Sequence, residues 1–387
     1  MNDDVVYLDN AATSYPKPYK VYEEIQKYLM YYCANPGRGG HKMAIYAGNA
    51  IYEARKDIAG FFNINNPLRL CFTKNATEAL NIVIKGILKP GDHVITTSME
   101  HNSVLRPLKY VEKCLGVEVT IVWGNNFGEI DADSIRRSIK KNTVLIAASL
   151  SSNVNGTILP IEEIGSISRE NGLMFLLDSA QEAGSINIDV VKMNVDFLAF
   201  SGHKGLLGPP GTGGLYVRDG INLKPLLHGG TGSNSKSSEQ PELMPDLLES
   251  GTINLPGVVG LATGIRFIRN IGIENIAYYK QLLLKRFYES IKDIKGIKIY
   301  SLTDNSKNSG ILAINFSGFD SSEIASILDT QYGIATRGGF HCAPLAHETL
   351  GTEKQGLVRF SIGCFNTIEE IDYAANALKA ISGKLVQ

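Results

Sequence analysis

The sequence has few cysteines and no cluster of them. Its 387 residues include five cysteines, an odd number, and no two of them form a C-x-x-C pair. They are Cys33, Cys71, Cys114, Cys342 and Cys364. This spacing argues against a disulfide framework and against a zinc site, so we expect no bound metal. A reducing, cytoplasmic setting is the simplest interpretation.

An excess of one charge and long apolar runs are also missing. Lysine and arginine together number 38 and aspartate and glutamate 39, which gives a net charge of −1. We therefore expect no basic face and no nucleic-acid partner. No apolar run approaches the length of a membrane span. The opening residues 1–4 lack the basic and apolar regions of a secretory signal, and we predict no membrane association.

Short apolar runs alternate with amphipathic stretches through most of the chain, and 44% of the residues are hydrophobic. This alternation predicts a parallel or mostly parallel sheet covered by helices on both faces. Ligands in such sheets bind at the carboxyl ends of strands. The predicted strands are Val94–Thr97, Glu118–Val122, Thr143–Ala148, Met174–Leu177, Phe197–Phe200 and Gly214–Val217.

The C-terminal third has a pattern of its own, which predicts a smaller α/β domain. A long helical pattern runs from about Val258 to about Ile294. After it come a strand, a helix and a strand, at Ile311–Phe316, Glu323–Tyr332 and Leu357–Ser361. Residues 229–243 are small and polar, and they are the best candidate for a mobile loop.

Lys204 lies at the centre of the most informative segment. The apolar strand Phe197–Phe200 ends in Ser201-Gly202-His203-Lys204, and a glycine-rich turn leads into the next strand. A lysine at a strand end, beside small hydrogen-bonding residues, suits a Schiff base to pyridoxal phosphate (PLP). Ser201 and His203 can reach the cofactor's phosphate, and the glycines let the backbone come close. The alternative is a surface lysine in a glycine-rich loop.

Two other segments place polar groups where a helix begins or a strand ends. Asn75-Ala76-Thr77 stands at a predicted helix start, where free N–H groups and the helix dipole bind phosphate. The alternative there is an ordinary N-cap. Asp178 follows the strand Met174–Leu177 and can pair with a pyridinium nitrogen, while Gln181 can touch the phenolic oxygen of the ring. Asp178 fits equally well as an N-cap after a buried strand.

His101 and Asn153 also follow predicted strands. An imidazole at His101 can stack on a cofactor ring and shuttle protons, although a lone histidine is more often structural. Asn153 can hydrogen-bond a cofactor or substrate, or it can be an ordinary turn residue. The functional interpretation of both residues is strengthened by their occurrence together with the Lys204 segment.

Taken together, these residues resemble the fold-type I PLP enzymes in order, spacing and strand-end context. The resemblance is to the class V aminotransferase family, and within it to the cysteine desulfurase/selenocysteine lyase group. It implies a large PLP-binding domain at 16–262 with a mixed, mostly parallel seven-stranded sheet. It also implies a small α/β C-terminal domain at 263–387, completed by residues 1–15. Further segments that carry the resemblance are Tyr7–Thr13, Asn35–His41, Glu249–Asn254 and Arg337–Pro344.

The resemblance assigns roles to individual residues. Lys204 would carry PLP and transfer protons, Asp178 would pair with the pyridine nitrogen, and Gln181 would contact the phenolic oxygen. The other implied cofactor residues are Asn75, Ala76, Thr77, His101, Asn153, Ser201 and His203, with Gly251 and Thr252 reaching across a homodimer interface. Arg359 would clamp the substrate carboxylate with its bidentate guanidinium, or it would be a plain strand arginine. Asn153, Ala11 and Ala12 complete the implied substrate site.

Cys342 determines which reaction the resemblance implies. A cysteine desulfurase uses a thiolate to take sulfur from L-cysteine, which gives an enzyme persulfide and L-alanine, whereas a transaminase needs no thiol. Cys342 lies in a glycine-rich turn, and the nearby Arg337 and His341 are expected to favour its thiolate. L-selenocysteine would be cleaved by the same chemistry.

Two other functions stay open on the sequence. Cys342 could be incidental to a transaminase or β-lyase, or the protein could be a non-catalytic sulfur-relay scaffold. The short link from Gly339 to Cys342 resembles the subgroup with a compact cysteine loop, which implies a rigidly held thiol and slow turnover that a sulfur-acceptor protein accelerates. Three features depart from the family pattern, and one of them is an N-terminus shorter than in the better-known members, which suggests a short-N-terminus branch. Phe340 stands where many relatives have a histidine, and Glu249–Asn254 has an unusual Gly-Thr-Ile-Asn ending.

Overall fold

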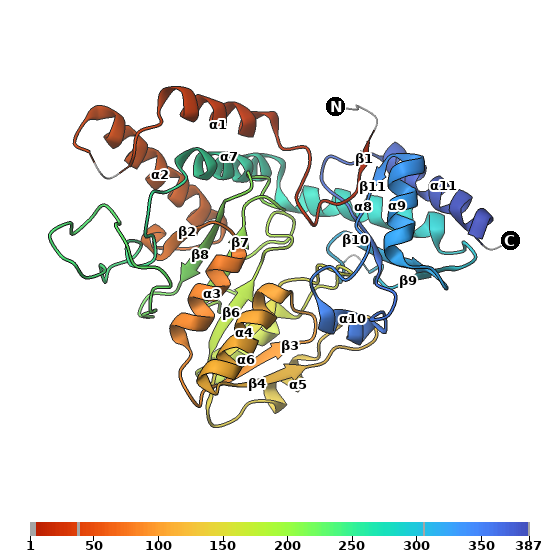
Figure 1. Ribbon diagram of the computed structural model, residues 1–387, viewed down its shortest axis with the longest axis horizontal. Coiled ribbons are helices and arrows are strands. Elements are labelled where there is room, and N and C mark those ends of the chain that lie inside the picture. Colours follow the sequence, from red (N-terminus) through yellow and green to blue (C-terminus); the bar gives the residue numbers. More distant parts are fainter. Residues whose placement is uncertain (1–4, 37–38, 305, 386–387) are drawn as a thin grey trace.

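The structure is a computed structural model that describes residues 5–36, 39–304 and 306–385 (Figure 1). Gly37 and Arg38 of the Asn35–His41 segment lie outside the described residues. Within them, each helix is too short or too polar to span a lipid bilayer. Figure 1 shows a larger α/β body with a smaller one beside it, formed mainly by the C-terminal part of the chain.

The larger body is built on a seven-stranded mixed sheet. The order is β2 (Leu70–Thr73), β8 (Gly213–Val217), β7 (Phe197–Ser201), β6 (Met174–Asp178), β5 (Thr143–Ser149), β3 (His93–Thr97) and β4 (Glu118–Val122). From β7 to β4 all neighbours are parallel, and β8 is antiparallel to both of its neighbours. The predicted mixed, mostly parallel sheet is confirmed.

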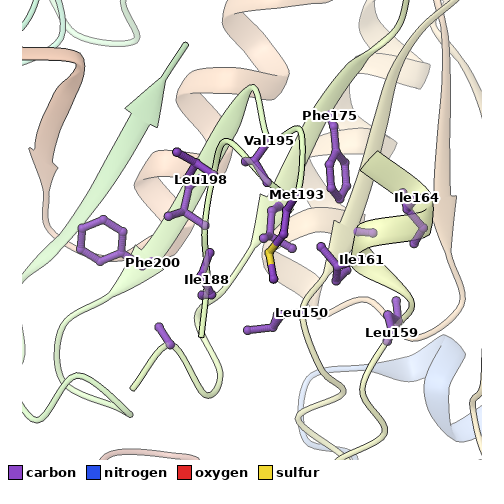
Figure 2. Packing of buried hydrophobic residues seen from close by; sticks show 14 of the residues in the cluster. Leu150, Leu159, Ile161, Ile164, Phe175, Ile188, Met193, Val195, Leu198 and Phe200 are labelled. Atoms are coloured by element: carbon purple, nitrogen blue, oxygen red, sulfur yellow. The ribbon is translucent and has the colours of Figure 1, made fainter. Parts of the chain in front are cut away.

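Helices cover both faces of this sheet, because its central strands are apolar on both sides. Along β5, Leu145 and Ala147 pack into one core, while Ile146 and Ala148 pack into the other. Figure 2 shows part of the second core, where Phe175, Leu198 and neighbouring side chains meet. The helices of this body are α1 (Tyr19–Tyr31), α2 (Lys42–Phe61), α3 (Ala76–Ile87), α4 (Asn102–Leu115), α5 (Ala132–Arg137), α6 (Ile161–Glu170) and α7 (Leu255–Ile271), with a short 3-10 turn at Pro67–Arg69.

The smaller body has its own sheet and core. Its antiparallel sheet has the order β12 (Val358–Ser361), β10 (Ile311–Phe316) and β9 (Ile297–Ile299). The N-terminal strand β1 (Val6–Tyr7) pairs in parallel with β11 (Ile334–Ala335), so both ends of the chain meet here. The helices of this body are α8 (Ile273–Ile291), α9 (Ser321–Tyr332), α10 (Pro344–Leu350) and α11 (Ile368–Leu385).

The predicted single helix from Val258 to Ile294 is wrong in one respect, since two helices, α7 and α8, occupy this stretch. The chain breaks at Gly272, whose φ of +92° lies outside the helical range and suits glycine. The division at residue 262 stays a prediction, and α7 would cross it. Residues 229–243 are outside the helices and strands, as predicted, and their mobility stays a prediction.

Candidate active site

A polar cavity opens at the carboxyl ends of β5, β6 and β7, where such sheets bind ligands. Every predicted cofactor residue except Gly251 and Thr252 lines it. The lining consists of Asn75, Ala76, Thr77, His101, Ser103, Ser149, Ser151, Asn153, Asp178, Ala180, Gln181, Ser201, His203 and Lys204. Sequence reasoning missed Ser103, Ser149, Ser151 and Ala180.

Lys204 reaches the cavity from the turn after β7. The turn is tight, because a Cβ at Gly202 would collide with Thr212 Oγ1, so the sequence needs glycine there. Burial lowers the pKa of Lys204 to about 8, while Asp178 acts in the opposite direction. The amine is therefore more readily neutral near physiological pH than an ordinary lysine.

The start of α3 forms one wall of the cavity. The Asn75 side chain caps the helix by accepting from Glu78 N at 3.0 Å, so the predicted helix start is confirmed. Ser201 Oγ accepts from Ala76 N at 3.1 Å, which ties this wall to the end of β7. Positive helix-dipole charge and a hydroxyl on Thr77 are therefore directed at the cavity.

His101 is the N-cap of α4 and is held by Ser103. Its Nδ1 accepts from Ser103 N at 3.0 Å, which places the proton of the neutral ring on Nε2. Ser103 Oγ also lies 2.8 Å from Thr77 Oγ1, so it bridges two predicted residues. Burial lowers the pKa of His101 to about 4, and Lys204 acts in the same direction. The imidazole is neutral at pH 7.

Asp178 ends β6 as predicted and lies opposite Ser149 in the sheet. Its Oδ1 accepts from Ala180 N at 2.9 Å, and burial raises the pKa of its carboxyl while Lys204 lowers it. Behind it lies Glu100, a fully buried residue that sequence reasoning missed. Thr97 and Ser149 donate to this carboxyl, and burial raises the pKa of Glu100 to about 7.

The N-terminal segment closes the cavity beside Gln181. Gln181 Nε2 donates to Ala11 O at 3.0 Å, and Ala11 N donates to Ser361 Oγ at 2.9 Å. Ala11 therefore contacts a residue that lines the cavity, but neither Ala11 nor Ala12 is itself part of the lining, and their role in substrate binding stays a prediction. Sequence spacing could not reveal this arrangement, because Ala11 and Ser361 are 350 residues apart.

Arg359 lies behind Asn153 and is fully buried. Its Nη1 donates to Asn153 O at 2.8 Å and its Nη2 to Asp9 Oδ1 at 2.6 Å. Within the described residues its Nε has no hydrogen-bond partner. Asp9 is a counter-charge that the sequence did not predict.

Cys342 is exposed in a turn held against the cavity. Its carbonyl accepts from Asn102 N at 2.8 Å, and the preceding carbonyl of His341 accepts from Asn153 Nδ2 at 2.8 Å. Arg337 Nη2 lies 3.6 Å from the sulfur. We expected His341 to favour the Cys342 thiolate. A charged His341 ring cannot do so near pH 7, because burial lowers the pKa of His341 well below its usual value.

Gly251 and Thr252 lie elsewhere, in a hollow that they share with Phe72 and Asn254. Glu249 anchors this segment through a buried ion pair with Arg55 at 2.7 Å and accepts from Phe72 N at 2.6 Å. Within one chain, these two residues do not reach the cavity that contains Lys204. Their predicted role across a dimer interface stays a prediction.

The residues of the cavity fit a phosphorylated pyridine aldehyde. Two buried lining atoms, His203 Nδ1 and Ser151 Oγ, have no hydrogen-bond partner within the described residues, so polar groups stand ready for a ligand. A helix start suits the phosphate, Asp178 suits a ring nitrogen, and the Lys204 amine suits the aldehyde.

The chain is similar to known proteins over nearly its whole length. The model of the family described as aminotransferase class-V matches residues 6–374. A probable cysteine desulfurase of Methanothermobacter thermautotrophicus is 37% identical, with 98% of this chain and 95% of that protein covered. The cysteine desulfurase of Haloferax volcanii is 32% identical, with 97% and 89% covered.

Solved structures of cysteine desulfurases are also similar to this chain. The apo cysteine desulfurase of Thermococcus onnurineus NA1 matches with a TM-score of 0.93 and 35% identity, covering 99% of this chain and 96% of that chain. The cysteine desulfurase CsdA of Escherichia coli matches with a TM-score of 0.89 and 28% identity, covering 100% and 96%.

Proposed function

The chain belongs to the aminotransferase class-V family, and we propose that it is a PLP-dependent cysteine desulfurase that takes sulfur from L-cysteine onto Cys342. The observation that carries this proposal is the position of the Cys342 turn. Two of its carbonyls are held by Asn102 and Asn153, beside the cavity that contains Lys204.

When bound, PLP supplies an electron sink for bonds around the substrate's α-carbon. Lys204 Nζ holds and moves the proton, since its pKa of about 8 leaves part of the amine neutral near pH 7. Asp178 holds the ring nitrogen protonated, and neutral His101 offers an N–H donor or a stacking face. The start of α3 with Thr77, Ser201 and His203 holds the phosphate.

Cys342 receives the sulfur. Its thiolate, beside the Arg337 guanidinium, forms an S–S bond with the substrate sulfur as the Cβ–S bond breaks. The electron pair of the broken bond stays with the carbon fragment, which takes up a proton and leaves as L-alanine. Arg359, together with Asn153, Ala11 and Ala12, is our candidate for orienting the substrate carboxylate. L-selenocysteine offers the same atoms with selenium in place of sulfur.

We also propose a homodimer, because Gly251 and Thr252 line a separate hollow and not the chain's own cavity, and they would serve the partner's phosphate. Helices α1 and α2 expose large apolar and aromatic side chains, which supports an interface there. These include Tyr19, Tyr22, Leu29, Met30, Tyr31, Met43, Ile45 and Tyr46. A sulfur-acceptor protein is the proposed recipient of the persulfide, and a cytoplasmic location is proposed from cysteine usage.

Product analysis tests the proposal. The PLP-loaded protein is incubated with L-cysteine and a reductant, and sulfide and alanine are measured for wild type, Cys342→Ala and Cys364→Ala. We expect both products from wild type and Cys364→Ala, and neither from Cys342→Ala. Equal sulfide from Cys342→Ala would assign another PLP reaction, with Cys342 incidental. No binding of PLP and no product from wild type would favour the scaffold.

A further inference from the structure

A hydrogen-bonded chain of side chains runs behind the Cys342 turn. Thr352 Oγ1 lies 2.8 Å from His347 Nδ1, and His347 Nε2 lies 3.3 Å from His341 Nδ1. The other nitrogen of His341, Nε2, lies 3.1 Å from the carbonyl oxygen of Arg337. All three side chains are buried, and the two rings are nearly parallel, at 9°.

The geometry fixes the direction of every bond in this chain. A carbonyl can only accept, so His341 Nε2 carries the proton and donates to Arg337 O. Nδ1 of the neutral ring then accepts, so His347 Nε2 is the donor to it. His347 Nδ1 therefore accepts in turn, and the hydroxyl of Thr352 donates to it. With both rings neutral, one arrangement of protons satisfies all three contacts. The Thr352 hydroxyl also lies 3.4 Å from the His347 carbonyl oxygen, which is a longer contact than the 2.8 Å to His347 Nδ1.

Both rings stay neutral near pH 7, which this arrangement requires. Burial lowers the pKa of His347 to about 4, and burial together with the Arg359 guanidinium lowers the pKa of His341 well below its usual value. His341 has no nitrogen left to accept a proton from the Cys342 thiol, because one nitrogen donates to Arg337 O and the other accepts from His347.

The backbone around the thiol needs support. His341 and Cys342 have φ of +50° and +57°, a region that favours glycine, and neither residue is glycine. The carbonyls of both residues are held by Asn153 and Asn102. The His341 ring joins this turn to the backbone of Arg337, whose guanidinium contacts the sulfur.

We propose that the chain from Thr352 through His347 and His341 to the Arg337 carbonyl positions the Cys342 thiol against the Arg337 guanidinium. His341 and His347 are positioning residues here, and the proton of the thiol leaves to solvent or substrate. The inference deepens the proposed function, because it concerns the thiol that would receive sulfur. Its tests need no turnover, so a failed desulfurase assay would leave their outcome readable.

Imidazole ¹⁵N spectra test the proton arrangement. The protein has seven histidines, so labelling histidine with ¹⁵N gives a small set of imidazole signals. Variants with a single His→Gln substitution assign each signal to its residue. We expect His341 and His347 to be neutral from pH 6 to pH 8 with the proton on Nε2. A charged ring, or a proton on Nδ1 of either residue, would contradict the proposed proton arrangement.

Alkylation of Cys342 tests the positioning. The PLP-loaded protein is treated with iodoacetamide at pH 7, and peptide mapping by mass spectrometry separates Cys342 from the other cysteines. We expect Thr352→Val to slow alkylation of Cys342 about two- to fivefold, the scale of losing one exposed charge contact. Thr352→Ser keeps the hydroxyl and should restore the rate. Thr349→Val changes a residue of α10, the helix that also carries His347, but lies outside the hydrogen-bonded chain, and it should match wild type.

A double-variant comparison distinguishes the loss of thiol positioning from a general destabilisation of the turn. Arg337→Met removes the guanidinium and keeps the carbonyl, so it should slow alkylation like Thr352→Val. Adding Thr352→Val to Arg337→Met should then cause no further loss. An equal further loss in that background, or a wild-type rate in Thr352→Val, would overturn the proposal. Thermal unfolding checks that each variant is folded, and His347→Leu repeats the test at a second position.

Discussion

Arg359 Nη2 donates to Asp9 Oδ1 at 2.6 Å, and this ion pair joins the two ends of the chain beside the cavity. The arginine side chain is fully buried, while that of Asp9 is 20% exposed. A buried guanidinium without its carboxylate is costly, because protein groups replace only part of its hydration. Asp9 therefore holds the predicted carboxylate-binding residue in a defined place.

We predict that Asp9→Ala lowers the free energy of unfolding by about 3 kcal/mol, since it leaves the Arg359 charge uncompensated. Asp9→Asn should cost less, because its amide oxygen can still accept from Nη2. Urea unfolding of the two variants beside wild type measures both effects. If Asp9→Ala were as stable as wild type, solvent and not Asp9 would be compensating Arg359.

A second buried pair, Glu182 with Lys280, links the two bodies next to Gln181. Lys280 lies on α8, and both side chains are no more than 10% exposed. Lys280→Met should cost about 3 kcal/mol of unfolding free energy, because it leaves a buried carboxylate unpaired, and adding Glu182→Gln should recover most of it. The exposed pair Arg286–Asp372 provides the control, where Arg286→Met should change little. Equal losses in the single and double variants would contradict this.

The sheet could be predicted from the sequence because its strands are short apolar runs with clear ends. Polar residues follow both Phe197–Phe200 and Met174–Leu177, and both runs are strands in the structure. The break at Gly272 was missed, since apolar residues continue on either side of it and one glycine is tolerated within many helices.

The site could be predicted wherever one short segment contains all the residues that indicate its function, as at Lys204 and at Asn75–Thr77. It was not predictable where partners come from distant segments. Asp9 reaches Arg359 across 350 residues, and the burial of Glu100 depends on the whole sheet. A local signal existed for Ser103, a hydroxyl two residues after His101, which is the N-cap of α4 in the structure.

The buried carboxyl of Glu100 should make stability depend on pH. Its pKa is raised to about 7, so between pH 4.5 and pH 7 the folded state binds a proton that the unfolded state has lost. The contribution of Glu100 to the free energy of unfolding is therefore fully present at low pH. It falls by about 3 kcal/mol as the pH rises from 4.5 to 7. Neighbouring histidines act oppositely, so the variant Glu100→Gln is needed to isolate the effect.

We expect Glu100→Gln to gain stability relative to wild type as pH rises from 5 to 8, because glutamine cannot ionise. Its amide oxygen can still accept from Thr97 and Ser149. Urea unfolding of both proteins at several pH values gives the difference. A constant difference across this range would mean that the carboxyl ionises normally in the folded state.

The attachment of PLP should report the charge around Lys204. Only the neutral amine attacks an aldehyde, and burial lowers the pKa of Lys204 to about 8, so the attachment rate should rise with pH through about 8. Asp178 raises this pKa, so Asp178→Asn should move the midpoint to lower pH, and Glu182→Gln should move it less. The rate is followed by absorbance after mixing apo-protein with PLP. A midpoint near that of an ordinary lysine, or a shift to higher pH in Asp178→Asn, would show that another group controls the amine.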